Sequence, residues 1–161
     1  MSKPTFAYTT YIRTTPERLW KGLTDPAFTK RYWNITFETD WQVGSPMVWD
    51  NQGARIDDPE QVVLESNPYT RLSYTWHSFT QELADAVGFS AEQQAALAGE
   101  SRSKVTFDIE DQQPMVKLTV IHETADPDGL VLSMVSGGWP QVLAALKTLL
   151  ETGRAPSEPA A

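Results

Sequence analysis

Two histidines, His77 and His122, are the side chains of this sequence best suited to proton transfer or metal binding, and the chain contains no cysteine. Imidazole changes its charge near neutral pH, so it often serves as a general base or a metal ligand. Yet the sequence contains no HExxH, no EF-hand loop, no GxGxxG and no glycine–lysine phosphate loop. His122 and Glu123 do not form a dyad, because neighbours on a strand point to opposite faces. We therefore predict no catalytic residues, no metal site and no cofactor.

His122 has another potential role, in ligand binding. It is in phase with Leu118 and Val120 on an alternating segment, so its ring is predicted to face the apolar side of a sheet. A desolvated imidazole there could donate a hydrogen bond to a ligand carbonyl. The alternative is a histidine at the end of a strand whose nitrogens are satisfied by the backbone or by water, and we favour that alternative.

Aromatic side chains give the strongest functional signal. Leu72, Tyr74 and Trp76 alternate onto one face of a strand, and if that face is concave they line the same space as Val120 and Trp139. Rings with polar tips suit an amphipathic or aromatic small molecule, although the same rings also provide bulk for a core. Our candidate ligand-binding residues are Trp20, Tyr32, Trp49, Tyr74, Trp76, Val120, His122, Met134, Gly138, Trp139 and Leu143.

The first third of the chain predicts one strand followed by two short helices. Residues 5–13 alternate and are rich in aromatic and β-branched side chains, as is typical of a strand. In the first helix, Thr15 is the expected N-cap and Pro16 the first helical residue. Trp20 and Trp33 fall on the two helices, where we expect them to pack mainly in the core.

The middle of the chain predicts a sheet interrupted by an insertion. A period of two between residues 35 and 78 indicates an antiparallel meander, and residues 102–111 and 114–124 predict two longer strands with one apolar face. Residues 81–99 break the alternation and are rich in alanine, which favours a helical insertion between strands.

Residues 137–153, GGWPQVLAALKTLLETG, predict a long C-terminal helix. The apolar face of the sheet is the only partner large enough for the stripe on this helix. We expect Gly137 and Gly138 to remove side chains where the helix begins close to the sheet, Pro140 to lie in its first turn and Gly153 to end it. The stripe consists of Val142, Leu143, Leu146, Leu149 and Leu150.

This order of elements, with the stretches YIRTTPERLWKGLTDPAFTKRYW, RLSYTWH and GGWPQVLAALKTLLETG, resembles the activator of heat-shock-protein-90 ATPase homologue-like family of the START-like (SRPBCC) superfamily. The resemblance implies an α+β helix-grip fold, in which a curved antiparallel sheet wraps a long C-terminal helix and leaves a hydrophobic cavity. We expect residues 1–153 to form one such domain, with 81–99 as an insertion, and residues 154–161 to be a disordered tail.

Charge and hydropathy limit the partners. The chain has 13 Lys and Arg against 21 Asp and Glu, a net charge of -8, and this field repels phosphate backbones and anionic membrane surfaces. No segment approaches the ~20 apolar residues that span a bilayer, and the N-terminus lacks the apolar core of a signal peptide. We predict a cytoplasmic protein that binds neither nucleic acid nor membranes.

These observations leave three functional hypotheses open. The first is a non-catalytic protein that encloses a hydrophobic or amphipathic small molecule between sheet and helix. The resemblance implies the second, an accessory to a heat-shock-protein-90-type chaperone in the stress response. The eukaryotic co-chaperones carry an additional N-terminal domain that this sequence does not match, so we expect no stimulation of the chaperone ATPase. The third is a cyclase or dehydratase that uses the same cavity, which no acid–base pair in the sequence supports.

Overall fold

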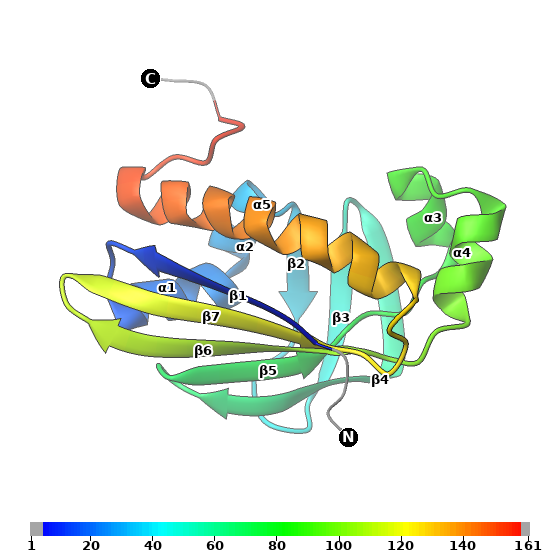
Figure 1. The fold of residues 1–161 in the computed structure, drawn as a ribbon, viewed down its shortest axis with the longest axis horizontal. Coiled ribbons are helices and arrows are strands. Elements are labelled where there is room, and N and C mark those ends of the chain that lie inside the picture. The colour runs from blue at the N-terminus through cyan, green and yellow to red at the C-terminus, as the bar shows by residue number, and fades with distance from the viewer. Residues whose placement is uncertain (1–4, 159–161) are drawn as a thin grey trace.

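The computed structural model describes residues 5–158, and in that part of the chain seven strands and five helices follow one another (Figure 1). The N-terminal elements are β1 (Thr5–Ile12), α1 (Pro16–Thr24), α2 (Pro26–Tyr32), β2 (Ile35–Glu38), β3 (Pro46–Asn51), β4 (Ala54–Asn67) and β5 (Arg71–Thr75). They are followed by α3 (Gln81–Val87), α4 (Ala91–Ala98), β6 (Lys104–Gln112), β7 (Met115–Glu123) and α5 (Leu130–Thr152).

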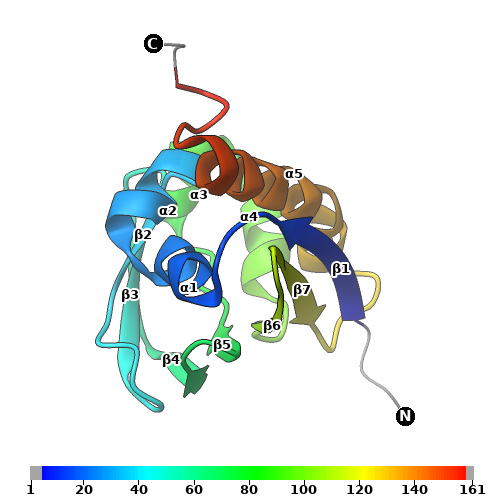
Figure 2. The same ribbon diagram turned by 90° about the vertical axis from the view of Figure 1, so that its left-hand side faces the viewer.

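The strands form one antiparallel sheet in the order β1-β7-β6-β5-β4-β3-β2. In Figure 1, α5 lies across the sheet, with α3 and α4 near its first turns and α1 and α2 towards its end. Figure 2 looks almost along α5 and shows the sheet curving around it. The predicted α+β helix-grip fold is confirmed, including the two short helices after the first strand and the helical insertion.

Local capping explains the two short helices. The Thr15 side chain accepts a hydrogen bond from the backbone N–H of Arg18 at 3.2 Å, and Pro16 opens α1. Helix α2 begins in the same way: the Asp25 side chain accepts a hydrogen bond from the backbone N–H of Ala27 at 2.9 Å, and Pro26 is the first helical residue. Each cap satisfies one backbone donor that the first turn leaves free, so these helix starts are readable from sequence.

The core lies between the concave face of the sheet and α5. Val116, Leu118, Val120 and His122 of β7 are all buried, as their alternation predicts. Four leucines of the α5 stripe are also buried, whereas Val142 is partly exposed: Leu143, Leu146, Leu149 and Leu150. Helix α1 approaches α5 closely, since a Cβ atom on Gly22 would lie 3.0 Å from Cδ1 of Leu146.

The long helix begins earlier than predicted. It starts at Leu130 rather than near Gly137, so Pro140 lies inside it. Apart from the backbone of α5 itself and the adjacent residues, no heavy atom lies within 4 Å of the position that a Cβ on Gly137 or Gly138 would take. The expectation that these glycines permit a close approach to the sheet is therefore wrong. The Glu100 carboxylate accepts from the backbone N–H of Leu130 at 2.7 Å. This cap comes from the loop after α4, which a local sequence pattern cannot show.

Residues 154–158 belong to the segment predicted as a disordered tail, and in the structure they make contacts with α2 and with one another. Ala155 is buried, and Arg31 of α2 binds the Glu158 carboxylate at 2.7 Å. The Glu158 side chain also accepts from the backbone N–H of Ala155 at 2.8 Å. These contacts hold the segment against the end of α2, and residues 159–161 lie outside the described residues.

Candidate functional site

A pocket of about 510 Å³ opens between the first half of α5, helix α3 and the β2–β3 edge of the sheet. Its size and its mainly aromatic and aliphatic wall are typical of a small-molecule site, and none of its lining residues is charged. The pocket is lined by Trp33, Ile35, Asn51, Gln52, Trp76, His77, Phe79, Leu83, Ala86, Val87, Phe89, Val131, Met134, Val135, Gly138, Trp139 and Val142.

Three indole rings form a continuous aromatic cluster in this wall. The ring centres of Trp33 and Trp139 are 5.4 Å apart, those of Trp76 and Trp139 are 5.7 Å apart, and those of Trp33 and Trp76 are 6.2 Å apart. The rings come from the end of α2, the segment after β5 and the middle of α5. Packing of the helices onto the sheet therefore assembles an aromatic surface that a flat apolar ligand can contact.

His77 has a defined protonation state in the pocket wall. Its Nδ1 lies 2.9 Å from the carbonyl oxygen of Ser78, which can only accept, so Nδ1 carries the proton. In the neutral ring Nε2 is then an acceptor, and it receives a hydrogen bond from Nδ2 of Asn51 at 3.3 Å. Burial lowers the pKa of His77 to about 4, so the ring is uncharged near neutral pH.

His122 lies beneath the pocket wall rather than in it. Nε1–H of Trp139 donates to its Nδ1 at 3.2 Å, which leaves the proton of the neutral ring on Nε2. Nε2 therefore donates to Oγ of Ser103 at 2.9 Å. Burial, followed by the nearby His77, lowers the pKa of His122 to about 4. Both nitrogens have protein partners, and these are side chains, not the backbone or water named in the non-ligand alternative.

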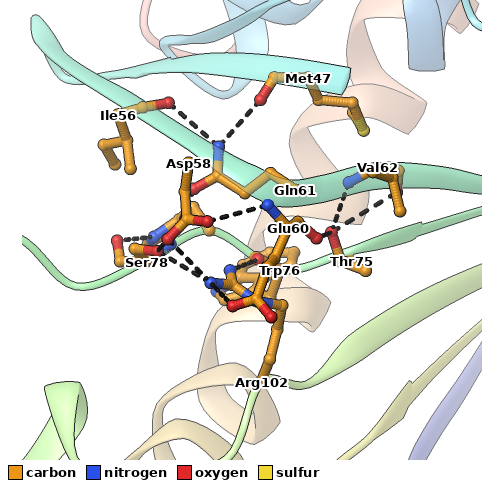
Figure 3. A network of polar contacts seen from close by, with 11 residues as sticks. Met47, Ile56, Asp58, Glu60, Gln61, Val62, Thr75, Trp76, Ser78 and Arg102 are labelled. Carbon is orange, nitrogen blue, oxygen red and sulfur yellow. Dashed lines mark hydrogen bonds and ion pairs between the residues drawn. The ribbon is translucent and has the colours of Figure 1, made fainter. Parts of the chain in front are cut away.

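Arg102 fixes the segment that carries Trp76 and His77 into the pocket. Its guanidinium donates to the carbonyl of Trp76 at 2.8 Å, to Oγ of Ser78 at 3.0 Å and to Asp58 at 3.1 Å (Figure 3). Ser78 in turn donates to Asp58 at 2.7 Å, and this bond is the main cause of a lowered pKa of the Asp58 carboxyl. The charge of Arg102 is thus compensated outside the pocket.

Gln61 supports the same segment from the sheet. The β3–β4 register shifts so that Pro46 pairs with Val62 but Val48 pairs with Asp57, and Gln61 belongs to the residues left between these pairs. Its fully buried amide donates to the carbonyls of Met47 and Ile56 at 2.9 and 3.1 Å (Figure 3). The amide oxygen accepts from the backbone N–H of Ser78 at 3.0 Å, so a bulge in β4 positions a pocket segment.

Four of the candidate ligand-binding residues meet at this pocket: Trp76, Met134, Gly138 and Trp139. Met134 is 41% exposed and lies at the rim. A Cβ on Gly138 would meet no heavy atom within 4 Å, so the missing side chain leaves open space in the pocket wall. These residues come from the segment after β5 and from α5.

The other seven candidates lie away from the pocket wall. Trp49, Tyr74, Val120 and Leu143 are buried in the core, and His122 sits behind Trp139 as described above. The hydroxyl of Tyr32 donates to the carbonyl of Gly22 at 2.7 Å. Trp20 packs edge-on against Tyr69, with ring centres 6.1 Å apart.

Sequence reasoning missed much of the wall, including its polar pair, Asn51 and His77. It placed Trp33 mainly in the core and gave the insertion no role in the site. One signal was present: Leu83 and Val87 of α3 are four residues apart, as are Val131 and Val135 of α5, so each pair shares a helix face. The second pair would have been recognised if the C-terminal helix had been predicted to begin at Leu130 instead of Gly137.

Among residues 5–158, no group of three or more His, Asp or Glu side chains is arranged to hold a metal ion. Over the same residues, no helix is long and apolar enough to cross a membrane.

A curved antiparallel sheet, closed by a long C-terminal helix over a largely apolar pocket, defines a helix-grip domain of the START-like class. The chain belongs to the family described as activator of Hsp90 ATPase homolog 1-like protein, whose sequence model matches residues 13–151. No curated protein matches the sequence.

Solved structures share the fold. Protein MLL2253 from Mesorhizobium loti is 25% identical, with a TM-score of 0.69 over 91% of this chain and 96% of that chain. CalU16 from Micromonospora echinospora is 20% identical, with a TM-score of 0.66 over 94% of this chain and 77% of that chain. The Aha1 dimer from Colwellia psychrerythraea is represented by a chain that is 19% identical, with a TM-score of 0.65 over 94% of this chain and 99% of that chain.

Proposed function

We propose that this protein binds a hydrophobic or amphipathic small molecule in the pocket between α3, α5 and the β2–β3 edge. The observation that carries the proposal is a pocket of about 510 Å³ with a mostly apolar lining and few polar groups. Burying an apolar ligand there gains roughly 25 cal/mol for each Å² removed from water. The polar pair Asn51 and His77 can then orient the ligand.

We infer that the ligand is held rather than converted. The two imidazoles are neutral, each has a protein partner at both nitrogens, and burial lowers the pKa of each to about 4. A general base works best with a pKa near the operating pH, so neither ring is tuned for that role near neutrality. The charged side chains nearest to the pocket segment, Arg102 and Asp58, bind one another outside the pocket.

The proposal is tested by thermal unfolding with a panel of sterols, fatty acids, flavonoids and polycyclic aromatics. A ligand at a hundred times its dissociation constant adds about 2.7 kcal/mol to the free energy of unfolding, which raises the melting temperature by several degrees. Native mass spectrometry of protein purified without added ligand provides an independent readout. A panel without any shift, together with an unliganded mass, would count against a ligand-binding function.

The family description supports a second candidate, an accessory role with a heat-shock-protein-90-type chaperone. Two apolar side chains at the pocket rim are exposed, Met134 to 41% and Val87 to 38%, and a protein partner could bury them. The net charge of -8 opposes association with an acidic chaperone. The chaperone ATPase rate, measured with increasing amounts of this protein, separates the two candidates: saturable stimulation at micromolar concentration would favour the second.

A further inference from the structure

The pocket wall offers no counter-charge to an ionised ligand. None of the residues that line the pocket is Asp, Glu, Lys or Arg. The guanidinium of Arg102, which holds the segment that carries Trp76 and His77, is bound to Asp58, Ser78 and the Trp76 carbonyl. Burying a carboxylate or sulfate without a partner is strongly unfavourable. The chain as a whole is acidic, which adds to the penalty for an anion. An uncharged ligand avoids both the burial of an unpaired charge and the repulsion by the acidic chain.

The side-chain hydrogen-bond acceptors of the wall reduce to one pair. Gln52 lines the pocket, but its side chain is engaged elsewhere: Nε2 donates to the carbonyl of Trp33 at 3.3 Å, and Oε1 accepts from Nδ2 of Asn34 at 2.8 Å. The indole N–H of Trp139 is used by His122. The indole N–H groups of Trp33 and Trp76 can only donate. Asn51 and His77 therefore remain as the side chains of the wall whose nitrogen or oxygen atoms can accept a hydrogen bond from a ligand.

This pair presents acceptors. The bond from Nδ1–H of His77 to the carbonyl of Ser78 fixes Nε2 as an acceptor, and this in turn requires Asn51 to direct its amide nitrogen, not its oxygen, at the ring. At 3.3 Å the Asn51–His77 bond is longer than the usual 2.9–3.0 Å for N–H donors, so a better donor can replace it. A hydroxyl group is such a donor, because O–H bonds are shorter and a hydroxyl also accepts from the freed amide.

We propose that the pocket selects an uncharged aromatic ligand with a hydroxyl group that donates its proton to Nε2 of His77. The flat ring system of the ligand packs against the indoles of Trp33, Trp76 and Trp139. This inference rests on the proposed ligand-binding function and narrows its chemistry to phenol-like molecules. Free fatty acids and other carboxylates are excluded from the same space.

Three naphthalenes that differ in one substituent test the inference. Affinities of the full chain for 2-naphthol, 2-methoxynaphthalene and 2-naphthoate are measured by isothermal titration calorimetry near neutral pH. The hydroxyl compound is expected to bind roughly three- to tenfold more tightly than the methyl ether, which cannot donate, and at least tenfold more tightly than the carboxylate. A methyl ether or a carboxylate that binds as tightly as the naphthol overturns the inference, while the proposed function stands.

Two variants identify the acceptor. His77→Phe keeps a ring but removes Nε2, so naphthol and its methyl ether should bind with equal affinity. Asn51→Leu removes the competing donor but leaves His77, so the preference for naphthol should persist. Loss of the preference only in Asn51→Leu would overturn the role of His77. If His77→Phe does not fold, the naphthalene affinities of the parent chain and of Asn51→Leu still test the inference. A preference for naphthol in both supports it, and no preference in the parent chain overturns it. If no naphthalene and no compound of the wider panel binds, the proposed function itself fails.

Discussion

Trp139 of α5 donates an indole hydrogen bond to Nδ1 of His122 on β7 at 3.2 Å, and this bond ties the helix that covers the pocket to the sheet beneath it. Both residues are buried, with exposed fractions of 3% and 0%, so water cannot replace the bond. The indole ring lines the pocket while its N–H anchors it to the core. The position of the pocket wall and the stability of the fold therefore depend on the same contact.

Trp139→Phe should therefore lower the free energy of unfolding by about 1 to 3 kcal/mol, because it leaves a buried acceptor unpaired on His122. Urea denaturation measures the change. Trp33→Phe is the matched control, since it trims an indole of the same pocket wall without touching His122. Equal losses in the two variants would show that the hydrogen bond adds nothing beyond ring size.

Gly138 and Gly137 offer a paired test of the pocket wall. Both lie inside α5 with open space where a Cβ atom would lie, but only Gly138 lines the pocket. Leucine at either position should stabilise the helix by roughly 0.5 to 1 kcal/mol. Gly138→Leu should also weaken binding of 2-naphthol at least tenfold, while Gly137→Leu should leave it unchanged. Calorimetric affinities that are the same in both variants would place the ligand elsewhere.

The two buried histidines make stability depend on pH. Their folded-state pKa is lowered from 6.5 to about 4, so between these values the unfolded chain binds protons that the folded chain does not. The free energy of unfolding should therefore fall as the pH decreases from about 6.5 to about 4, by about 3 kcal/mol for each histidine over the full window. Lowered pKa values of the Asp58 and Glu158 carboxyls keep them ionised in the upper part of this window.

Urea denaturation at about pH 7 and about pH 5 measures this loss, and the same experiment on His77→Phe should show roughly half of it, because one imidazole remains. A parent chain with the same stability at both pH values would mean that the histidines are not held neutral by burial.

The sequence predicted those parts of the fold that local patterns determine. Thr15–Pro16 and Asp25–Pro26 start helices through their own side chains, and alternation from Val116 to His122 places one face of β7 in the core. The start of α5 was missed because two glycines and Pro140 weaken a helix locally, whereas burial of Val131 and Val135 and the Glu100 cap stabilise it through distant contacts. The site was only partly predicted for the same reason.

His77 shows most clearly that the site depends on contacts between residues distant in the sequence. The carbonyl of the adjacent Ser78 sets its tautomer, but the sequence pattern does not show that this contact forms. Its place in a pocket depends on Asn51, Arg102 and Gln61 from other strands and loops. Alternation placed Trp76 on a strand face that, if concave, shares a space with Trp139, but it could not separate the pocket from the core beneath it. That boundary depends on side-chain packing between elements.

Arg102→Met removes the three hydrogen bonds that the guanidinium makes with Trp76, Ser78 and Asp58. The Trp76–Ser78 segment should then be held less firmly, and 2-naphthol binding should weaken several-fold. Stability should fall by about 1 to 2 kcal/mol, since the arginine is partly buried. Arg55→Met is the control: Arg55 pairs with Glu38 on the exposed surface, so its removal should change stability by less than about 1 kcal/mol and leave affinity unchanged. Thermal unfolding and calorimetry provide both readouts, and unchanged affinity in Arg102→Met would show that the segment holds its position without the network.

A pair of valines distinguishes the core from the pocket. Val120 is fully buried opposite Phe107 in the β6–β7 ladder, whereas Val142 is partly exposed and lines the pocket. Val120→Phe forces a ring into packed space and should lower the free energy of unfolding by about 1 to 3 kcal/mol. Val142→Phe places the same ring at the pocket, so stability should hold while 2-naphthol binding is lost. Urea denaturation and titration of both variants measure the contrast. If Val120→Phe is stable but no longer binds the ligand, the binding site would lie in the interior between sheet and helix and not in the pocket described here.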